Sequence, residues 1–313
     1  MNQPNNRPFF ILACDRSGTT LLRLMLNAHP RLCVPNESDF ITELYDRVSE
    51  FGAVERVDNL DGLLDALFAN PRYRLWKLDD QCVRQAAQRS DQSLRGIIES
   101  VFVCFAERDS KPRWGDKTPR YTVRVETLAR LFPDAQIILL ARDPRAVHAS
   151  LKTVNWHPHC PLFNANKWRE YWIKATRDLS KYYPLNHLVV KYEDLVAEPE
   201  AVLRRICEFL KEDYAESMLH YYQTARQHQP EDLEHHELTL LPVSTVPARK
   251  WMDTLNSYEI FVVEHITGDL MESLGYKPSP APNCLASAWF TTRLAFARCR
   301  QRAASLRNRS AST

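Results

Sequence analysis

The start of the chain places the strongest constraint on the fold, because an apolar run leads through a short polar turn into an amphipathic pattern. Residues 9–14 are continuously apolar, which is typical of a strand buried on both faces of a parallel sheet. After the turn at 15–18, apolar side chains recur with helical spacing over residues 21–28 and stop at His29 and Pro30. The chain is therefore predicted to open with a strand, a loop and a helix.

The same alternation recurs further along the chain. Residues 120–132 are interpreted as a helix, 135–141 as a buried strand and 144–152 as a helix with proline in its first turn. A further strand is predicted at 187–191 and a further helix at 199–210. Strands that alternate with helices indicate a doubly wound α/β fold, in which helices flank a mainly parallel sheet.

Two long segments, 39–108 and 161–183, interrupt this alternation with mainly helical patterns. Insertions of that size usually cap the carboxyl edge of such a sheet, where ligands bind. We therefore predict a single α/β domain over residues 1–278, with the helical insertions forming one side of a ligand site at that edge. The remaining residues, 279–313, are predicted to be a basic tail, part helix and part disordered.

The loop after the first strand has the composition of an anion site. Free backbone N–H groups at the positive end of a helix dipole suit a phosphate or a sulfate, and Gly18 lets the backbone approach it. Ser17, Thr19 and Thr20 add hydroxyl donors, and Arg16 adds positive charge. These residues predict a nucleotide-phosphate site. The alternative is a strand-to-helix turn that merely uses glycine and small polar caps.

This loop departs from the Walker A sequence, because Thr19 stands in the position of the lysine and Ala13 in that of the first glycine. That departure weakens the interpretation as a kinase. The run from Asp15 to Pro30 resembles the 5'-phosphosulfate loop of the sulfotransferases, especially the tyrosylprotein branch and its bacterial relatives. The resemblance implies a P-loop-containing fold and 3'-phosphoadenosine 5'-phosphosulfate as the donor, with 3',5'-diphosphoadenosine as the product.

A second candidate segment follows the strand at 135–141. Arg142 stands at the strand end and Ser150 eight positions later, a spacing that lets both side chains reach one anion. The resemblance assigns this pair to the 3'-phosphate of the donor, and the alternative is an ordinary surface pair with a solvated serine. Asp143 is interpreted as a helix cap and Arg145 as an exposed side chain without a ligand.

A third segment, 244–251, resembles the late loop that closes over the donor in this family. Ser244 and either Arg249 or Lys250 are the candidates there, and the residues leave open which of the two cations contacts the donor. A basic helix start is the alternative interpretation.

Sulfuryl transfer needs in-line geometry, a cation for the leaving oxygen and a base for the incoming hydroxyl. Lys117 follows a predicted strand at 113–114, at the carboxyl edge of the sheet. The resemblance implies that Lys117 stabilises the leaving group and that Arg16 assists it. The alternative for Lys117 is a solvated loop lysine.

The base implied by the same resemblance is Glu37, which follows the first helix at the distance where these enzymes carry a glutamate. Such a base acts near pH 7 either through a raised pKa or in concert with bond formation. The alternative is an acid that caps a helix over 39–45. Small-molecule sulfotransferases use a histidine instead, but His148 and His157 lie in no matching context.

The charge balance and the cysteine content indicate which partners, metals and cell compartment to expect. The chain has 41 basic and 39 acidic residues, a net charge of +2 that predicts no nucleic-acid partner. Arginine, lysine and backbone donors can neutralise the donor, so no metal is predicted, and the run from His157 to Cys160 has poor spacing for one. The eight cysteines contain no Cys-x-x-Cys pair, which favours reduced thiols and a cytoplasmic protein.

The tail from Cys284 onward contains six arginines and no acidic residue. Its apolar side chains fall on one helical face, which predicts either a terminal helix that covers the domain or a weak contact with an anionic membrane surface. The sequence leaves the oligomeric state open.

We therefore expect a sulfotransferase enzyme whose acceptor is a hydroxyl on a carbohydrate, on a small-molecule or lipid alcohol, or on a tyrosine. The enzyme alternative is a P-loop nucleoside or sugar kinase that uses ATP. A non-catalytic nucleotide-binding or scaffold protein is the alternative of another class, and the presence of Glu37 and Lys117 argues against it.

Overall fold

The computed structural model describes residues 6–228, 237–280 and 289–295. The chain divides into two compact units, the first formed by residues 1–141 and 173–244 and the second by residues 142–172 and 245–313. Each unit is described by itself below. The single domain expected over residues 1–278 stays a prediction.

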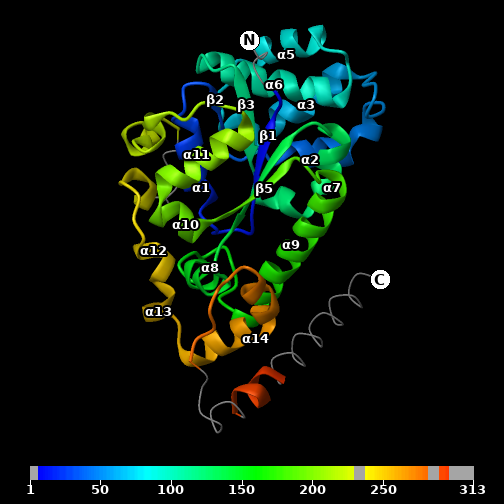
Figure 1. Cartoon of the computed structure of the whole chain (residues 1–313). Helices are drawn as coiled ribbons and strands as arrows, with labels where there is room; N and C mark the ends of the chain where they lie inside the picture. The colour runs from blue at the N-terminus through cyan, green and yellow to red at the C-terminus, as the bar shows by residue number, and fades with distance from the viewer. Residues whose placement is uncertain (1–5, 229–236, 281–288, 296–313) are drawn as a thin grey trace, which may run out of the picture. The chain divides into compact units, whose positions relative to one another are not determined.

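The first unit contains one five-stranded sheet in which every neighbouring pair of strands is parallel (Figure 1). Its strand order is β2-β3-β1-β4-β5. The strands are β1 (Phe9–Leu12), β2 (Leu32–Cys33), β3 (Arg113–Lys117), β4 (Gln136–Ala141) and β5 (His187–Lys191). Every residue of β1 and β4 is buried, as the continuous apolar runs predicted.

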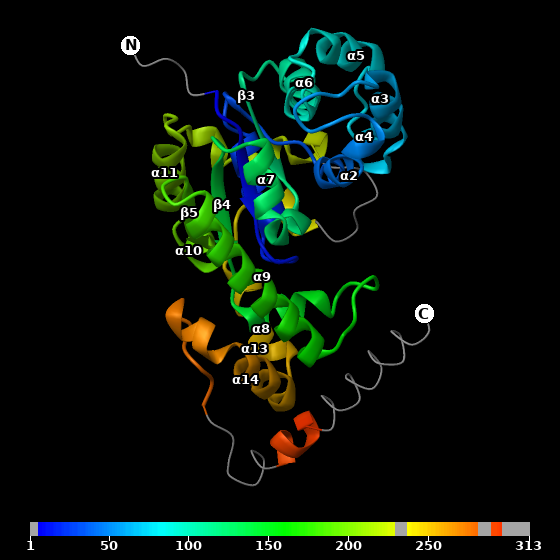
Figure 2. The same cartoon turned by 90° about the vertical axis from the view of Figure 1, so that its right-hand side faces the viewer.

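Helices lie on both faces of this sheet, so the predicted doubly wound α/β fold is confirmed. On one face lie α1 (Thr19–Asn27), α10 (Tyr192–Ala197) and α11 (Pro199–Leu210), and on the other lies α7 (Val125–Leu131) (Figures 1 and 2). The strand order reverses direction at β1, which puts the carboxyl end of β1 at the switch point where ligands bind in such sheets.

The first insertion is helical, as predicted, and packs beside β3 (Figure 2). Its helices are α2 (Phe40–Asp46), α3 (Leu60–Ala69), α4 (Pro71–Arg74), α5 (Asp80–Arg89) and α6 (Leu94–Arg108). An aromatic cluster joins it to the sheet, because the Phe102 ring stacks on Trp114 of β3 with 4.3 Å between ring centroids. Short 3-10 turns complete the unit: η1 (Val48–Glu50), η2 (Pro119–Val123), η3 (Glu216–Met218), η4 (Tyr221–Gln223), η5 (Ala225–His228) and η6 (Glu237–Leu240).

The regular elements that the structure describes in the second unit are all helices. It contains α8 (Pro144–Leu151), the first part of α9 (Pro161–Tyr182), α12 (Val246–Arg249), α13 (Trp251–Thr254) and α14 (Ser257–Ser273). A capping box between Asn256 and Glu259 starts α14. Residues 289–295 are also helical, and Leu294 packs against Leu162 and Val262. That short contact agrees with a covering helix; the rest of the predicted tail helix lies outside the described residues.

Two predicted elements differ from the structure. The helix expected over 120–132 is broken into η2 and α7, because the Thr122 hydroxyl bonds both the N–H and the carbonyl of Ala13, each at 2.8 Å, and Arg124 is not helical. Strand β3 extends through Lys117, so this residue ends a strand instead of standing in a loop. The two-residue strand β2 is too short to produce a periodic sequence signal.

No helix among the described residues is long and apolar enough to cross a membrane. The six cysteines within the described ranges carry free thiols, of which Cys82 and Cys160 are exposed and the other four buried. A cytoplasmic location stays a prediction, as does the membrane contact of the tail.

Candidate functional site

The loop between β1 and α1 has a backbone that few residues tolerate. Arg16 and Gly18 both have positive φ angles, of 63° and 90°. A Cβ atom on Gly18 would also lie 2.5 Å from Cε2 of the Tyr192 ring, so the ring closes the space that a side chain would need. Gly18 is therefore required by its conformation and by the packing of Tyr192, in addition to the close approach of an anion expected from the sequence.

We expect Gly18→Ala to lower the free energy of unfolding by about 1–3 kcal/mol through its backbone conformation alone. The contact with Tyr192 adds to that loss, so the double variant Gly18→Ala/Tyr192→Ala should lose less than the sum of the two single variants. Urea titrations of the three variants measure these differences. A Gly18→Ala protein as stable as the wild type would contradict the assignment.

The same loop contains polar groups that suit an anion. The Ser17 side chain is 1% exposed, and its Oγ has no hydrogen-bond partner among the described residues. Helix α1 begins without a side-chain cap, which leaves its first N–H groups for another acceptor. Thr19 is buried and Thr20 is half-buried at this helix start. The loop residues therefore fit a phosphate or phosphosulfate group.

Lys117 and Glu37 form an ion pair beside this loop. The Lys117 ammonium donates to Oε1 of Glu37 at 2.6 Å. Lys117 ends β3, and its backbone pairs with Ile11 of β1, the strand that leads into the loop. Its side chain is 5% exposed and that of Glu37 is 31% exposed, so the lysine is not a solvated loop residue. The two residues predicted to perform chemistry thus lie together at the carboxyl edge of the sheet.

Glu37 lies in the turn between β2 and α2, where its carboxylate has a second cation nearby. Glu37 is not the cap of α2, because the N-cap residue is Asp39. The Glu37 carboxylate instead accepts a hydrogen bond from Lys117. Its Oε2 is 4.0 Å from Nη2 of Arg72, on α4 of the insertion. The insertion therefore contributes a half-exposed arginine next to the predicted base.

Arg23 is a site residue that the sequence argument did not assign. It lies on α1 with 1% exposure and donates to the carbonyl of Val34 at 3.2 Å. Burial lowers its pKa to about 10, and the Glu37 carboxylate opposes that change, so Arg23 is charged at neutral pH. Burial also lowers the pKa of Lys117; Glu37 offsets part of this and Arg23 adds to it. Two buried cations thus surround one carboxylate, which favours an anionic ligand.

The second unit holds the other predicted donor residues. Arg142 directly follows β4 in the chain, and its Nη2 donates to the carbonyl of Pro247 at 2.8 Å. The indole of Trp168 donates to the Arg142 carbonyl at 3.1 Å. Ser150 lies near the end of α8 and is half-buried. Arg142 is thus bound to the 244–251 segment that the sequence also singled out.

The neighbours of Arg142 gave one correct and one wrong prediction. Asp143 caps α8 by accepting the Arg145 N–H at 2.8 Å, as expected. Arg145 was expected to be exposed, but its side chain is 5% exposed. It is buried because Asp143 and Glu264 each bond it at 2.6 Å and the Trp251 ring lies 4.0 Å below its guanidinium.

The late segment places its candidates on the surface. Arg249 and Lys250 are exposed at the junction of α12 and α13 in the second unit, and Ser244 is an exposed residue of the first unit.

The histidines considered as alternative bases take part in other contacts. His148 is buried on α8, where its Nδ1 contacts Asn164 at 2.9 Å, and burial lowers its pKa to about 4. The ring of His157 contacts the carbonyl of Pro158. His159, which belongs to the run considered for a metal, contacts the carbonyl of Val154. Within the described ranges, no three or more histidine, cysteine, aspartate or glutamate side chains form a group that could hold a metal.

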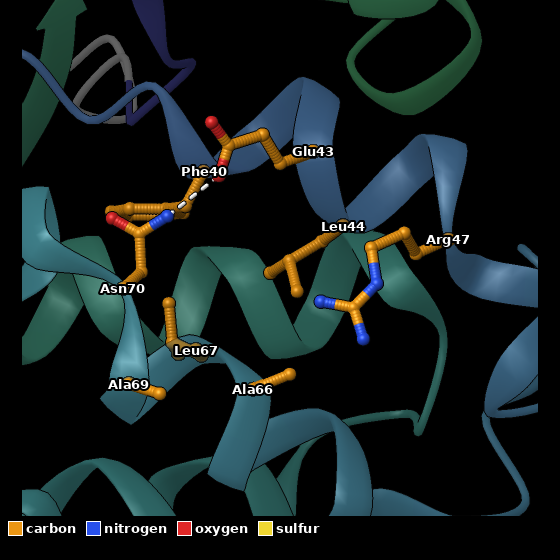
Figure 3. A pocket seen from close by; sticks show the side chains of 8 residues that line it. All are labelled: Phe40, Glu43, Leu44, Arg47, Ala66, Leu67, Ala69 and Asn70. Atoms are coloured by element: carbon orange, nitrogen blue, oxygen red, sulfur yellow. Dashed lines mark hydrogen bonds between the residues drawn. The ribbon is translucent and has the colours of Figure 1, made fainter.

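A cavity of about 230 Å³ lies between α2 and α3 of the insertion (Figure 3). Its apolar part is formed by Phe40, Leu44 and Leu67, and none of the predicted site residues lines it. The polar groups at its rim are already bonded, because Asn70 donates to Glu43 at 2.7 Å. It therefore gives no indication of a charged ligand.

Comparisons with known proteins agree on one family. The model described as "Sulfotransferase family" matches residues 8–216. Protein-tyrosine sulfotransferase A of Caenorhabditis elegans is 27% identical over 287 residues, which cover 88% of this chain and 69% of that protein. Nodulation protein NoeE of Sinorhizobium fredii (strain NBRC 101917 / NGR234) is 28% identical over 298 residues, covering 86% of this chain and 66% of that protein.

Solved structures show the same relationship. The sulfotransferase domain from the Synechococcus PCC 7002 olefin synthase superposes with a TM-score of 0.60 and 27% identity, over 90% of this chain and 98% of that one. The sulfotransferase domain from the curacin biosynthetic pathway superposes with a TM-score of 0.62 at 21% identity, over 89% and 100% of the two chains, and supports the fold alone.

Proposed function

The chain belongs to the sulfotransferase family, and on that premise we propose that it transfers a sulfuryl group from 3'-phosphoadenosine 5'-phosphosulfate to a hydroxyl of an acceptor. The observation that carries this proposal is the contact of 2.6 Å between Lys117 and Glu37 at the carboxyl edge of the sheet, beside a loop with an unpartnered buried hydroxyl on Ser17. A cation, a base and an anion site are the three parts that sulfuryl transfer needs.

The donor would be held by two sets of residues. Arg16, Ser17, Gly18, Thr19 and Thr20 would bind its 5'-phosphosulfate through charge, hydroxyls and backbone N–H groups. Their fit rests on the buried Ser17 hydroxyl and the uncapped start of α1.

The 3'-phosphate would be bound by Arg142 and Ser150, with Ser244 and either Arg249 or Lys250 covering it. When bound, the donor would supply the sulfuryl group, and 3',5'-diphosphoadenosine would leave through its 5'-phosphate oxygen. Arginine and lysine side chains would neutralise its charges without a metal ion.

Each catalytic residue then has one task. Glu37 accepts the proton of the acceptor hydroxyl, which becomes the nucleophile. Lys117 and Arg16 stabilise negative charge on the oxygen that leaves sulfur, and Lys117 also holds the Glu37 carboxylate in position. Arg23 adds a buried positive charge to the site, and this charge attracts an anionic ligand.

The acceptor is proposed to be an alcohol or a phenol bound on the side of the helical insertion. Relatives named for protein tyrosine make a tyrosine phenol the first acceptor to test, followed by carbohydrate and lipid alcohols. A screen with labelled donor and these three acceptor classes identifies which one receives the sulfate.

The proposed function is tested by calorimetric titration with 3',5'-diphosphoadenosine and, separately, with ATP and magnesium. We expect the bisphosphate to bind and ATP to bind far more weakly, because the loop lacks a Walker lysine. Tight binding of ATP without any binding of the bisphosphate would overturn the proposal.

A matched pair of variants refines this titration. Arg142→Ala should weaken bisphosphate binding by about 10–100-fold, since a charged hydrogen bond to phosphate contributes about 1.5–3 kcal/mol. Arg120→Ala changes an arginine whose side chain is 67% exposed and should leave the affinity unchanged. Equal affinities of the wild type and Arg142→Ala would remove Arg142 from the donor site.

A further inference from the structure

The part of the helical insertion around α4 contacts both ends of the turn that carries Glu37. The indole of Trp76 donates to the carbonyl of Asn36, the residue before Glu37, at 3.1 Å. The guanidinium of Arg72 donates through Nε to Oδ2 of Asp39, two residues after Glu37, at 3.1 Å. The insertion therefore holds the turn on either side of the predicted base.

This turn needs such support because its backbone is strained. Asp39 has a φ of 51° without being a glycine, a conformation that persists only where neighbouring contacts hold it. Its carboxylate does not cap α2 and is bonded to Arg72 instead. On the side of the sheet, the Ser38 N–H donates to Oγ1 of Thr118 at 3.0 Å. Contacts from the sheet and from the insertion thus hold the residues that flank Glu37.

The two donors on the insertion are themselves held in place. Trp76 is 3% exposed, and its ring packs against Phe40 and two phenylalanines of α6 with 5.1–5.3 Å between ring centroids. Arg108 of α6 donates to the Trp76 carbonyl at 2.8 Å. Asn70 caps α4 by accepting the N–H of Arg72 at 2.8 Å. The backbone of this segment is therefore fixed before it contacts the turn.

Arg72 also places a positive charge near the base. Its Nη2 is 4.0 Å from Oε2 of Glu37, while the Lys117 ammonium contacts Oε1 at 2.6 Å. A separation of 4.0 Å is too long for a hydrogen bond, so Arg72 acts on the carboxylate through its charge. Each oxygen of the Glu37 carboxylate thus has its own cation, and the insertion supplies one of them.

We propose that Trp76 and Arg72 are positioning residues, which hold the two ends of the turn 36–39 and so keep the Glu37 carboxylate against Lys117. The inference rests on the proposed function, which makes Glu37 the base. A base must lie within hydrogen-bonding reach of the hydroxyl that it deprotonates, and a displacement of about 1 Å can lower the rate about 100-fold. The insertion thereby sets the position of the base in addition to binding the acceptor.

The test compares the wild type with Trp76→Phe and Arg72→Gln. Phenylalanine keeps an aromatic ring in the cluster and removes the indole N–H, whereas glutamine removes the charge at a half-exposed position. Each variant should lower kcat by about 10–100-fold and leave the affinity for 3',5'-diphosphoadenosine unchanged, because neither side chain belongs to the proposed donor site. Arg72→Lys keeps a cation near Asp39 and should recover part of the lost turnover.

Two residues of the same segment provide matched controls, because their polar groups bond α5 instead of the turn. The Tyr73 hydroxyl donates to Oδ1 of Asp80 at 3.0 Å, and Nη1 of Arg74 donates to Oδ2 of the same carboxylate at 2.8 Å. Tyr73→Phe and Arg74→Gln should therefore keep the wild-type kcat. An equal loss of turnover in these controls would show that any loosening of the insertion slows the enzyme, and it would overturn the proposal.

A second measurement does not depend on turnover. Backbone hydrogen exchange over residues 36–41 should be about 10-fold faster in Trp76→Phe and Arg72→Gln than in the wild type, and unchanged in the two controls. Wild-type exchange of this segment or wild-type kcat in both variants would overturn the positioning role. Failure of the wild type to bind 3',5'-diphosphoadenosine would instead overturn the proposed function, so the two failures are distinguishable.

Discussion

Replacing Lys117 with methionine should lower kcat by about 10²–10³-fold, the usual cost of removing one group that stabilises developing charge. Its ammonium is nearly buried and bonds Glu37 at 2.6 Å, so a long neutral side chain removes the charge and keeps most of the packing. Affinity for 3',5'-diphosphoadenosine should change little, because the proposed role of Lys117 is on an oxygen whose charge develops during bond cleavage. Single-turnover kinetics and calorimetry measure the two quantities separately.

The matched control for this prediction is Lys111→Met. Lys111 is a half-buried lysine of the first unit, and its ammonium donates to the backbone carbonyl of Asn27. That variant should lose stability while it keeps turnover. If Lys117→Met turned over as fast as Lys111→Met, Lys117 would have no part in the chemistry.

Secondary structure could be predicted where a short apolar run alternates with a helical pattern. The bounds of β5 and α11 agree with the ranges read from the sequence, 187–191 and 199–210. The prediction of one helix over 120–132 was wrong, because a long-range contact from Thr122 to Ala13 holds a tight turn there. Local sequence patterns do not encode such a contact. Tertiary contacts overrode helix propensity there.

The candidate site could be predicted in part. A loop between a strand and a helix leaves a local signal in the sequence, whereas the burial of a charged side chain leaves none. The loop around Gly18 follows a strand and precedes a helix, as its residue types indicated. Arg23 and Arg145 gave no such signal. Charged residues usually lie on the surface, and only the fold shows that these two are buried and what surrounds them.

Glu37→Gln is expected to lower kcat by about 10²–10⁴-fold, the range for loss of a general base. Glutamine keeps an oxygen that can accept the hydrogen bond from Lys117, so the fold and the binding of 3',5'-diphosphoadenosine should be retained. The control is Glu43→Gln on α2, where the carboxylate is 49% exposed and contacts Arg120 and Asn70 outside the site. That variant should turn over like the wild type.

The double variant Glu37→Gln/Lys117→Met distinguishes a working pair from two independent residues. The two side chains are in direct contact, so their effects on kcat should be strongly non-additive, with the double variant close to the slower single variant. Losses that simply multiply would show that each residue acts alone. Wild-type turnover in Glu37→Gln would contradict its role as the base, and the acceptor proton would then have to leave through another group.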